Sequence, residues 1–319
     1  MAGREFGFEN TTDDVLDGID LTGRSFFITG AYSGLGKETA RAIAARGADV
    51  ILSGRDAEKL AAAAEEISGE TGANVETIVC DLGDLASIRA CGKEARERFA
   101  KIDVLINNAG VMACPLARTK DGFEMQFGTN HLGHFLLTSE LMPLIEQGAR
   151  QRIVNLSSRG HHFDGVHLDD PNFLSREYDK WASYGQSKTA NVLFAVGLES
   201  RFADKGIHAY AVHPGGIMTN LGRHLEPEDI ERLRKRVEDT SSGTGLTFKT
   251  IPQGAATTCF AATAPELEGV GGVYLEDVAV AQVDDDDPSG SVRSYAVDPA
   301  TADALWSLSE ELVGTRFAA

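Results

Sequence analysis

The stretch that decides the fold is "ITGAYSGLGKETA" (28–40), where three glycines separate an apolar run from a helical pattern. Gly30, Gly34 and Gly36 follow a G-x-x-x-G-x-G spacing. Glycines at such a junction allow a tight turn and a close backbone approach, and the free N–H groups of a helix N-terminus can bind a pyrophosphate. Glycine is abundant in this chain, so the motif alone could be a plain tight turn. Its position between a strand and a helix favours dinucleotide binding.

Apolar runs and helical patterns alternate along the rest of the chain. We expect strands at 25–29, 48–53, 75–80, 102–106, 152–157, 207–212 and 271–275. We expect helices at 34–46, 56–68, 84–99 and 119–146, and a further helix that carries Tyr184. Continuously apolar strands are typical of a sheet covered on both faces. The alternation therefore predicts an α/β fold in three layers, with a doubly wound parallel sheet of about seven strands.

The absence of a repeat or an interdomain linker predicts a single domain over 1–319, with 1–22 as an N-terminal extension. The chain has 48 acidic and 30 basic residues and a formal net charge of −18, which argues against nucleic acid or an anionic membrane as a partner. The acidic run 284–287 is flanked by proline and glycine, so we expect a solvated loop rather than a cation site.

Targeting signals are also missing from this sequence. The N-terminal stretch is charged and has no apolar core, and no apolar run approaches the length of a membrane span. No cysteine pair has the C-x-x-C spacing, so we expect four free thiols in a reducing compartment. These observations predict a cytoplasmic protein. The cysteines are Cys80, Cys91, Cys114 and Cys259.

The end of the second strand bears on the choice of cofactor. Many NAD-binding folds place an acidic residue there to bind the adenosine ribose hydroxyl groups. This chain has Gly54 at that place, followed by Arg55. A guanidinium beside a small residue suits a 2′-phosphate, so we expect NADP(H) to be favoured, with NAD(H) as the alternative. Arg55 could also face solvent without a ligand.

Seven motifs occur in an order that resembles the short-chain dehydrogenase/reductase superfamily. Within it, the chain looks like the retinol-dehydrogenase-like and protochlorophyllide-reductase-like branch, from about residue 15 to the end. The resemblance implies a Rossmann fold and a nicotinamide cofactor. The motifs are "TGAYSGLG" (29–36), "CDL" (80–82), "NNAG" (107–110), "NHLGHFLLT" (130–138), "IVNLSS" (153–158), "YGQSK" (184–188) and "HPGGIMT" (213–219).

The resemblance also implies roles for individual residues. The catalytic group would be Asn130, Ser158, Tyr184 and Lys188. Tyr184 would be the general acid/base, Lys188 its partner, and Ser158 the hydroxyl that orients the carbonyl group. The residues that would contact the cofactor are Gly30, Ser33, Gly34, Leu35, Gly36, Arg55, Asp81, Leu82, Asn108, Ala109, Gly110, Tyr184, Lys188, Pro214, Gly215, Ile217 and Thr219.

The chemistry of the pair Tyr184 and Lys188 agrees with that role. An unperturbed phenol has a pKa of about 10, too high for a base near neutral pH. Residues four apart share one face of a helix, so the ammonium of Lys188 is expected to favour the phenolate of Tyr184 and lower its pKa. A Y-x-x-x-K pair also arises by chance, as a surface pair of little consequence. The other motifs in register favour the catalytic interpretation.

Two features depart from the superfamily pattern. Ser158 precedes Tyr184 by 26 residues, about twice the usual spacing, so we expect 159–182 to roof a substrate pocket together with 216–250. Animal retinol dehydrogenases often begin with a membrane anchor, which this sequence lacks. Ser157 could replace Ser158 as the catalytic serine, but the second serine of such a pair is the usual one in the superfamily.

The sequence thus predicts an NADP(H)-dependent oxidoreductase that interconverts an apolar ketone or aldehyde and its alcohol. One alternative is a catalytically silent NADP(H)-binding sensor or scaffold, and another is an epimerase or dehydratase. The paired histidines 131/134 and 161/162 lack a third ligand at suitable spacing, so no metal is expected. The helices around 119–146 and 183–204 would be available for a homodimer interface.

Overall fold

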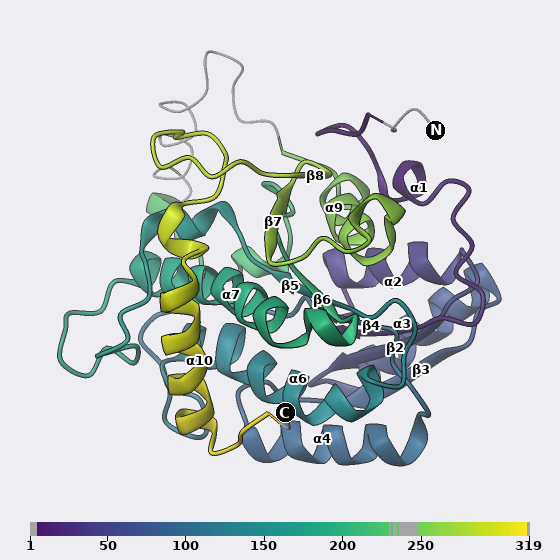
Figure 1. Cartoon of the computed structure of the whole chain (residues 1–319), viewed down its shortest axis with the longest axis horizontal. Coiled ribbons are helices and arrows are strands. Elements are labelled where there is room, and N and C mark those ends of the chain that lie inside the picture. Colours follow the sequence, from purple (N-terminus) through teal and green to yellow (C-terminus); the bar gives the residue numbers. More distant parts are fainter. Residues whose placement is uncertain (1–4, 230, 232–234, 236–247, 318–319) are drawn as a thin grey trace.

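The computed structural model describes residues 5–229, 231, 235 and 248–317. Its sheet has eight strands in the order β3-β2-β1-β4-β5-β6-β7-β8, of which the first seven are parallel and β8 pairs antiparallel to β7 (Figure 1). The predicted doubly wound sheet is confirmed, and the two-residue strand β8 is an addition too short to be recognised in sequence. The strands are β1 (Ser25–Thr29), β2 (Asp49–Gly54), β3 (Val75–Val79), β4 (Val104–Asn107), β5 (Arg152–Leu156), β6 (His208–Val212), β7 (Val273–Glu276) and β8 (Ala279–Val280).

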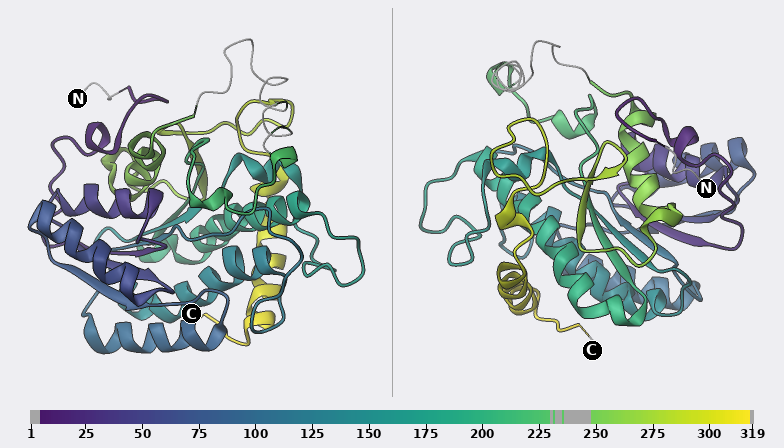
Figure 2. Two further views of the ribbon diagram at one scale, coloured as in Figure 1. Left: turned by 180° about the vertical axis from the view of Figure 1, so that it is seen from behind. Right: turned by 45° about the horizontal axis from the view of Figure 1, so that its top comes forward.

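Helices cover both faces of the sheet and produce three layers (Figures 1 and 2). One apolar cluster joins the sheet to α4 (Leu85–Arg98), α6 (Gly133–Ile145), α7 (Lys180–Phe202) and α10 (Pro299–Val313). A second cluster joins the opposite face to α1 (Thr12–Val15), α2 (Gly34–Ala44), α3 (Ala57–Thr71) and α9 (Ile251–Thr263).

The apolar pattern of each strand explains why both faces are covered. Successive side chains of a strand point to opposite faces. In β1, Phe26 and Ile28 belong to one cluster and Phe27 to the other, and all three are fully buried.

Helix starts are fixed by side-chain caps, since Asp56 accepts a hydrogen bond from the backbone of α3 and Asp84 caps α4 in the same way.

The strand order reverses between β1 and β4, because β1 continues to β2 on one side and β4 continues to β5 on the other. In open parallel sheets a crevice forms at the carboxyl ends of the two strands that flank such a reversal. The glycine turn after β1 and the segment after β4 therefore lie where a dinucleotide would bind.

The helix predicted over 119–146 begins later than expected. Residues 118–124 form a turn instead, with Gly122 at φ +89° and a backbone bond from Thr119 to Phe123. The helical stretch starts with α5 (Met125–Phe127), passes through the π-helical turn η1 (Gly128–Leu132) and continues as α6. The expectation was wrong because Lys120-Asp121-Gly122 is a turn sequence that interrupts the apolar pattern.

Several further sequence expectations can be placed on the structure. The four cysteines are free and buried, and residues 284–286 are exposed in a loop, as expected. Part of the predicted pocket segment 216–250 lies outside the described residues, namely 230, 232–234 and 236–247. Among the helices that the structure describes, none combines the length and apolar character needed to cross a bilayer.

Helix α10 packs along α7 and covers part of the face predicted for a homodimer. Trp306 of α10 is 5% exposed and stands at the centre of an aromatic cluster. The cluster fills the space between α6, α7, α10 and the C-terminal segment, so this part of the face is occupied by the chain itself. The rings within 6.3 Å of the Trp306 ring are Phe135, Phe194, Phe202 and Phe317.

We expect Trp306→Ala to lower the free energy of unfolding by about 3–5 kcal/mol, because the change leaves a cavity among packed rings. Urea unfolding followed by circular dichroism measures the loss. Leu174→Ala is the control, since the Leu174 side chain is 78% exposed and should cost little. Equal stabilities of the two variants would contradict the assignment of this cluster to the core.

Candidate active site

A cleft of about 710 Å³ opens at the carboxyl ends of β1 and β4. It contains most of the residues predicted to contact a cofactor. The predicted residues that line it are Gly30, Ser33, Gly34, Leu35, Gly36, Arg55, Asp81, Leu82, Asn108, Ala109, Gly110 and Thr219. Sequence reasoning missed other lining residues, which lie outside its motifs or beside them, among them Tyr32, Lys59, Thr129, Asn220, Leu221 and Arg223.

The glycine turn has the backbone geometry that a dinucleotide requires. Gly30 and Gly34 have φ +66° and +57°, a region that other residues rarely adopt. A Cβ on Gly36 would lie 2.5 Å from Asn108 Nδ2 and 2.6 Å from the Gly30 carbonyl oxygen, so only glycine fits there. Ser33 makes no side-chain cap to α2. The N–H groups at this helix start can therefore face a pyrophosphate.

The segment after β4 is tied to β1 by a hydroxyl group. Thr29 Oγ1 accepts hydrogen bonds from the backbone N–H groups of Asn108 (2.9 Å) and Ala109 (3.0 Å). Asn108 Nδ2 also donates to the Thr29 carbonyl oxygen at 2.8 Å. These bonds hold the floor of the cleft at a fixed distance from the glycine turn.

Arg55 is exposed at the end of β2, on the rim of the cleft. The Tyr32 ring packs on Gly54, where an added Cβ would meet it at 2.9 Å. Lys59 Nζ lies 5.8 Å from the centre of that ring and 2.8 Å from an Asp56 carboxylate oxygen. Two cations and an aromatic ring thus gather where the adenosine end of a dinucleotide is expected.

The four residues predicted for catalysis come from three segments of the chain. Tyr184 and Lys188 lie on α7, Ser158 follows β5, and Asn130 lies in η1. Lys188 Nζ donates to the Leu156 carbonyl oxygen at 3.0 Å and lies 5.6 Å from the centre of the Tyr184 ring. A Cβ on Gly160 would lie 2.6 Å from Tyr184 Cε1 and 3.3 Å from Ser158 Oγ, so both side chains lie against the same glycine.

Asn130 holds the neighbouring backbone in place. Its Nδ2 donates to the Val111 carbonyl oxygen and to Ser187 Oγ, both at 2.9 Å, and its Oδ1 accepts from the Val111 N–H. A Cβ on Gly110 would lie 3.2 Å from Asn130 Oδ1 and 3.7 Å from Lys188 Nζ. The cleft residue Gly110 therefore contacts two of the four predicted catalytic side chains.

The two neighbouring serines differ in their contacts. Ser157 is buried, and its hydroxyl donates to the Lys188 carbonyl oxygen at 2.9 Å. Ser158 caps the 3₁₀ turn η2 (Arg159–Phe163), where its Oγ accepts from the Gly160 N–H at 3.0 Å. Its hydroxyl also lowers the pKa of Tyr184. The geometry thus favours Ser158, as the sequence predicts, for a role beside the tyrosine.

The pKa values differ from the sequence expectation. Burial raises the pKa of Tyr184 to about 12, and the hydrogen bond from Ser158 offsets only part of that rise. Burial also lowers the pKa of Lys188 to about 8. Burial therefore dominates the pKa of the phenol, and the Lys188 ammonium, which was expected to lower it, is not among the causes of the shift.

The histidines near the site are held as separate neutral groups. His134 Nδ1 lies 2.9 Å from the Asn130 carbonyl oxygen, and its Nε2 lies 2.9 Å from Thr29 Oγ1. His131 Nε2 bonds instead to Ser309 Oγ on α10. Burial lowers the pKa of both rings, to about 4 for His134 and about 3 for His131. The residues that the structure describes include no cluster of three His, Cys, Asp or Glu side chains that could hold a metal ion.

Five predicted cofactor contacts do not line the cleft, namely Tyr184, Lys188, Pro214, Gly215 and Ile217. Gly215 has φ +99°, and a Cβ there would lie 2.7 Å from Lys249 Cδ. Ile217 packs toward Gly254 of α9. Both therefore face the packing between the segment after β6 and the start of α9, while Thr219 of the same motif does reach the cleft.

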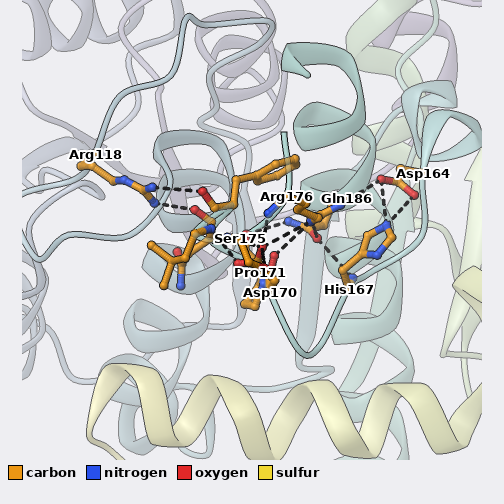
Figure 3. A network of polar contacts seen from close by, with 11 residues as sticks. Arg118, Asp164, His167, Asp170, Pro171, Ser175, Arg176 and Gln186 are labelled. Atoms are coloured by element: carbon orange, nitrogen blue, oxygen red, sulfur yellow. Dashed lines mark hydrogen bonds and ion pairs between the residues drawn. The ribbon is translucent and has the colours of Figure 1, made fainter. Parts of the chain in front are cut away.

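The inserted loop between η2 and α7 is ordered by a polar network (Figure 3). The Asp170 carboxylate accepts backbone hydrogen bonds from residues 174, 175 and 176, which lower its pKa. The Arg176 guanidinium lies 3.8 Å from the centre of the Phe173 ring and donates to Gln186 of α7 at 2.8 Å. Arg118 donates to the carbonyl oxygens of residues 172 and 173. The loop is thereby attached to both α7 and the turn before α5.

Known proteins resemble this chain over most of its length. A family model described as short chain dehydrogenase matches residues 24–229. The short-chain dehydrogenase/reductase prx1 of Penicillium rubens is 41% identical over 316 residues, covering 95% of this chain and 90% of the relative. Retinol dehydrogenase 13 of Homo sapiens is 40% identical over 297 residues, covering 92% of this chain and 86% of the human protein.

A solved structure of a protein from Mycobacterium paratuberculosis is also similar, with a TM-score of 0.73 and 36% identity. That match covers 98% of this chain and 100% of the other. The sheet order, the glycine turn and these matches lead to one conclusion. The chain belongs to the short-chain dehydrogenase/reductase superfamily, a family of oxidoreductases, and within it to the retinol-dehydrogenase-like branch.

Proposed function

We propose that this chain is an NADP(H)-dependent oxidoreductase that interconverts an apolar ketone or aldehyde and its alcohol, with Tyr184 as general acid/base. The observation that carries the proposal is the grouping of three side chains beside the cleft. A buried phenol and the Ser158 hydroxyl both lie against Gly160, and a buried ammonium lies one helical turn away on the same face of α7.

The proposed reaction assigns one task to each side chain. A bound nicotinamide supplies the hydride in reduction and accepts it in oxidation. In reduction, Tyr184 gives its proton to the carbonyl oxygen while the Ser158 hydroxyl stabilises the developing negative charge by a hydrogen bond. Lys188 stabilises the phenolate that remains, and Asn130 fixes the backbone beside it. In oxidation the same phenolate removes the proton of the alcohol.

The proposed preference for NADP(H) is supported by the end of β2. Gly54 occupies the place where an acidic side chain would repel a 2′-phosphate, and Arg55 and Lys59 lie on the rim of the cleft. A guanidinium and an ammonium can both pair with a phosphate, and the Tyr32 ring offers an adenine a surface for stacking. NAD(H) remains the alternative cofactor.

The proposed apolar substrate is supported by side chains at the mouth of the predicted pocket. Met218 is 71% exposed in the segment 216–250, and Leu174 is 78% exposed in the segment 159–182. Phe248 lies beside Gly216, where an added Cβ would meet its ring at 3.7 Å. The human relative at 40% identity carries the name retinol dehydrogenase, and retinol is an apolar alcohol.

We expect Tyr184→Phe to lower kcat at least ~100-fold, the usual scale for loss of a general acid, while the affinity for NADPH stays unchanged. A panel of apolar aldehydes and ketones followed by NADPH absorbance measures turnover, and NADPH fluorescence measures binding. Tight binding without turnover of any carbonyl by the parent protein would favour a silent sensor. Full turnover by the variant would refute the role of Tyr184.

Lys188 should control the pH dependence of the reaction. Reduction leaves a phenolate that the Lys188 ammonium stabilises, and burial lowers the pKa of Lys188 to about 8, so kcat/KM for reduction should fall as pH rises through about 8. Lys188→Met removes this titrating group, so the variant should have a lower kcat/KM and no fall near that pH. Lys188→Arg keeps its charge above pH 8, so it should also lose the fall but retain more of kcat/KM. An identical profile for the Met variant and the parent would contradict this role.

Arg55→Ala should raise KM for NADPH about 10- to 100-fold, because a charge-assisted hydrogen bond to the 2′-phosphate is lost. KM for NADH, which has no such phosphate, should stay nearly constant. Lys93→Ala removes a cation whose side chain is 75% exposed on α4, away from the cleft, and serves as the control. A parent protein that prefers NADH would overturn the proposed cofactor.

A further inference from the structure

The turn that follows the predicted catalytic serine is held by His161. The His161 backbone N–H donates to the Ser158 carbonyl oxygen at 3.0 Å, and the ring Nδ1 lies 2.8 Å from the same oxygen. A carbonyl oxygen only accepts, so Nδ1 carries the proton. The Nε2 atom accepts a hydrogen bond from the Arg293 backbone N–H at 3.2 Å. The two partners therefore fix one neutral tautomer of the ring.

The surroundings of His161 keep it neutral and rigid. The residue is fully buried, and burial lowers the pKa of its ring to about 3. Its own carbonyl oxygen accepts from the Tyr295 hydroxyl at 2.6 Å and from Thr189 Oγ1 of α7 at 3.2 Å. The C-terminal segment around 293–295 thus anchors a turn that lies more than 130 residues earlier in the chain.

The same turn contacts the proposed general acid. A Cβ on Gly160 would lie 2.6 Å from Tyr184 Cε1, so the backbone of the turn packs directly on the phenol ring. The Gly160 N–H also donates to Ser158 Oγ. A shift of this turn would therefore displace the serine hydroxyl and the wall that holds the tyrosine at the same time.

We propose that His161 is a positioning residue for the reaction, whose ring links the backbone of Arg293 to the backbone of Ser158 and so holds the serine hydroxyl against Tyr184. His161 acts through Ser158 and takes no proton itself. The inference rests on the proposed function of Ser158 and Tyr184. It adds that the C-terminal segment contributes to turnover, because the segment supplies both Arg293 and Tyr295.

Two substitutions of His161 test the hydrogen bond. His161→Phe keeps the ring shape but removes the donor, and misplacing a catalytic group by a fraction of an ångström should lower kcat about 10- to 100-fold. His161→Asn offers an amide N–H close to the place of Nδ1 and should retain more of kcat. The affinity for NADPH, measured by fluorescence, should be unchanged in both. Parental kcat in a folded His161→Phe variant would overturn the proposal.

A double-mutant cycle separates positioning from general destabilisation. If His161 acts through Ser158, then adding His161→Phe to Ser158→Ala should cost little further activity. Losses that multiply in the double variant would show that His161 acts independently, and would overturn the proposal. Parental turnover in Ser158→Ala alone would instead refute the proposed role of the serine, so the two failures are distinguishable.

A matched pair of tyrosine variants covers the case in which His161→Phe does not fold. Tyr295→Phe deletes the hydroxyl that anchors the His161 carbonyl oxygen and should lower kcat about fivefold, the scale of one hydrogen bond. Tyr210→Phe deletes a buried hydroxyl that donates to the Leu267 carbonyl oxygen at 3.1 Å, far along the chain from the turn. It should leave kcat unchanged. Equal kcat in the two folded variants would overturn the proposal.

Discussion

The ammonium of Lys188 is enclosed by protein, and the hydrogen bond that it donates to the Leu156 carbonyl oxygen ties α7 to the end of β5. Removing a charge from water is costly unless polar groups surround it. Here burial lowers the pKa of Lys188 to about 8, so the group still carries its charge near neutral pH. The rest of the site depends on this buried cation, because the Tyr184 ring and Gly110 lie beside it and the Leu156 carbonyl oxygen accepts its hydrogen bond.

Two opposing effects act on the pKa of the neighbouring Tyr184 phenol. Burial excludes water and raises the pKa of Tyr184, whereas the Ser158 hydroxyl lowers it. In the proposed enzyme, a positively charged nicotinamide would add a further stabilisation of the phenolate, which arises only when the oxidised cofactor is present. The phenol would then be a proton donor when the reduced cofactor is bound, and the phenolate a base when the oxidised cofactor is bound. A permanently acidic tyrosine would lose the first of these roles.

Much of this arrangement could be predicted from the sequence, for reasons that are local. Strand and helix periods, the glycine turn and the i, i+4 spacing of Tyr184 and Lys188 each depend on neighbouring residues. The parts that could not be predicted depend on contacts between distant segments. No periodic pattern in the sequence predicts the hydrogen bond from Arg293 to His161 or the packing of Trp306 against α7. The helix begins only at Met125, later than the sequence predicts, because a glycine turn precedes it.

The charged side chains that line the cleft are mostly basic, whereas the chain as a whole is acidic. A formal net charge of −18 would repel a dinucleotide phosphate at long range. Salt screens that repulsion beyond about 8–10 Å, so the charges lining the cleft decide the final approach. Those charges include Arg55 and Arg223, and the acidic side chains Asp81 and Asp84 lie with them. The Asp84 carboxylate lies 2.7 Å from Lys120 Nζ, and this ion pair offsets much of its negative charge. An anion that reaches the cleft therefore meets guanidinium groups and helix N–H donors.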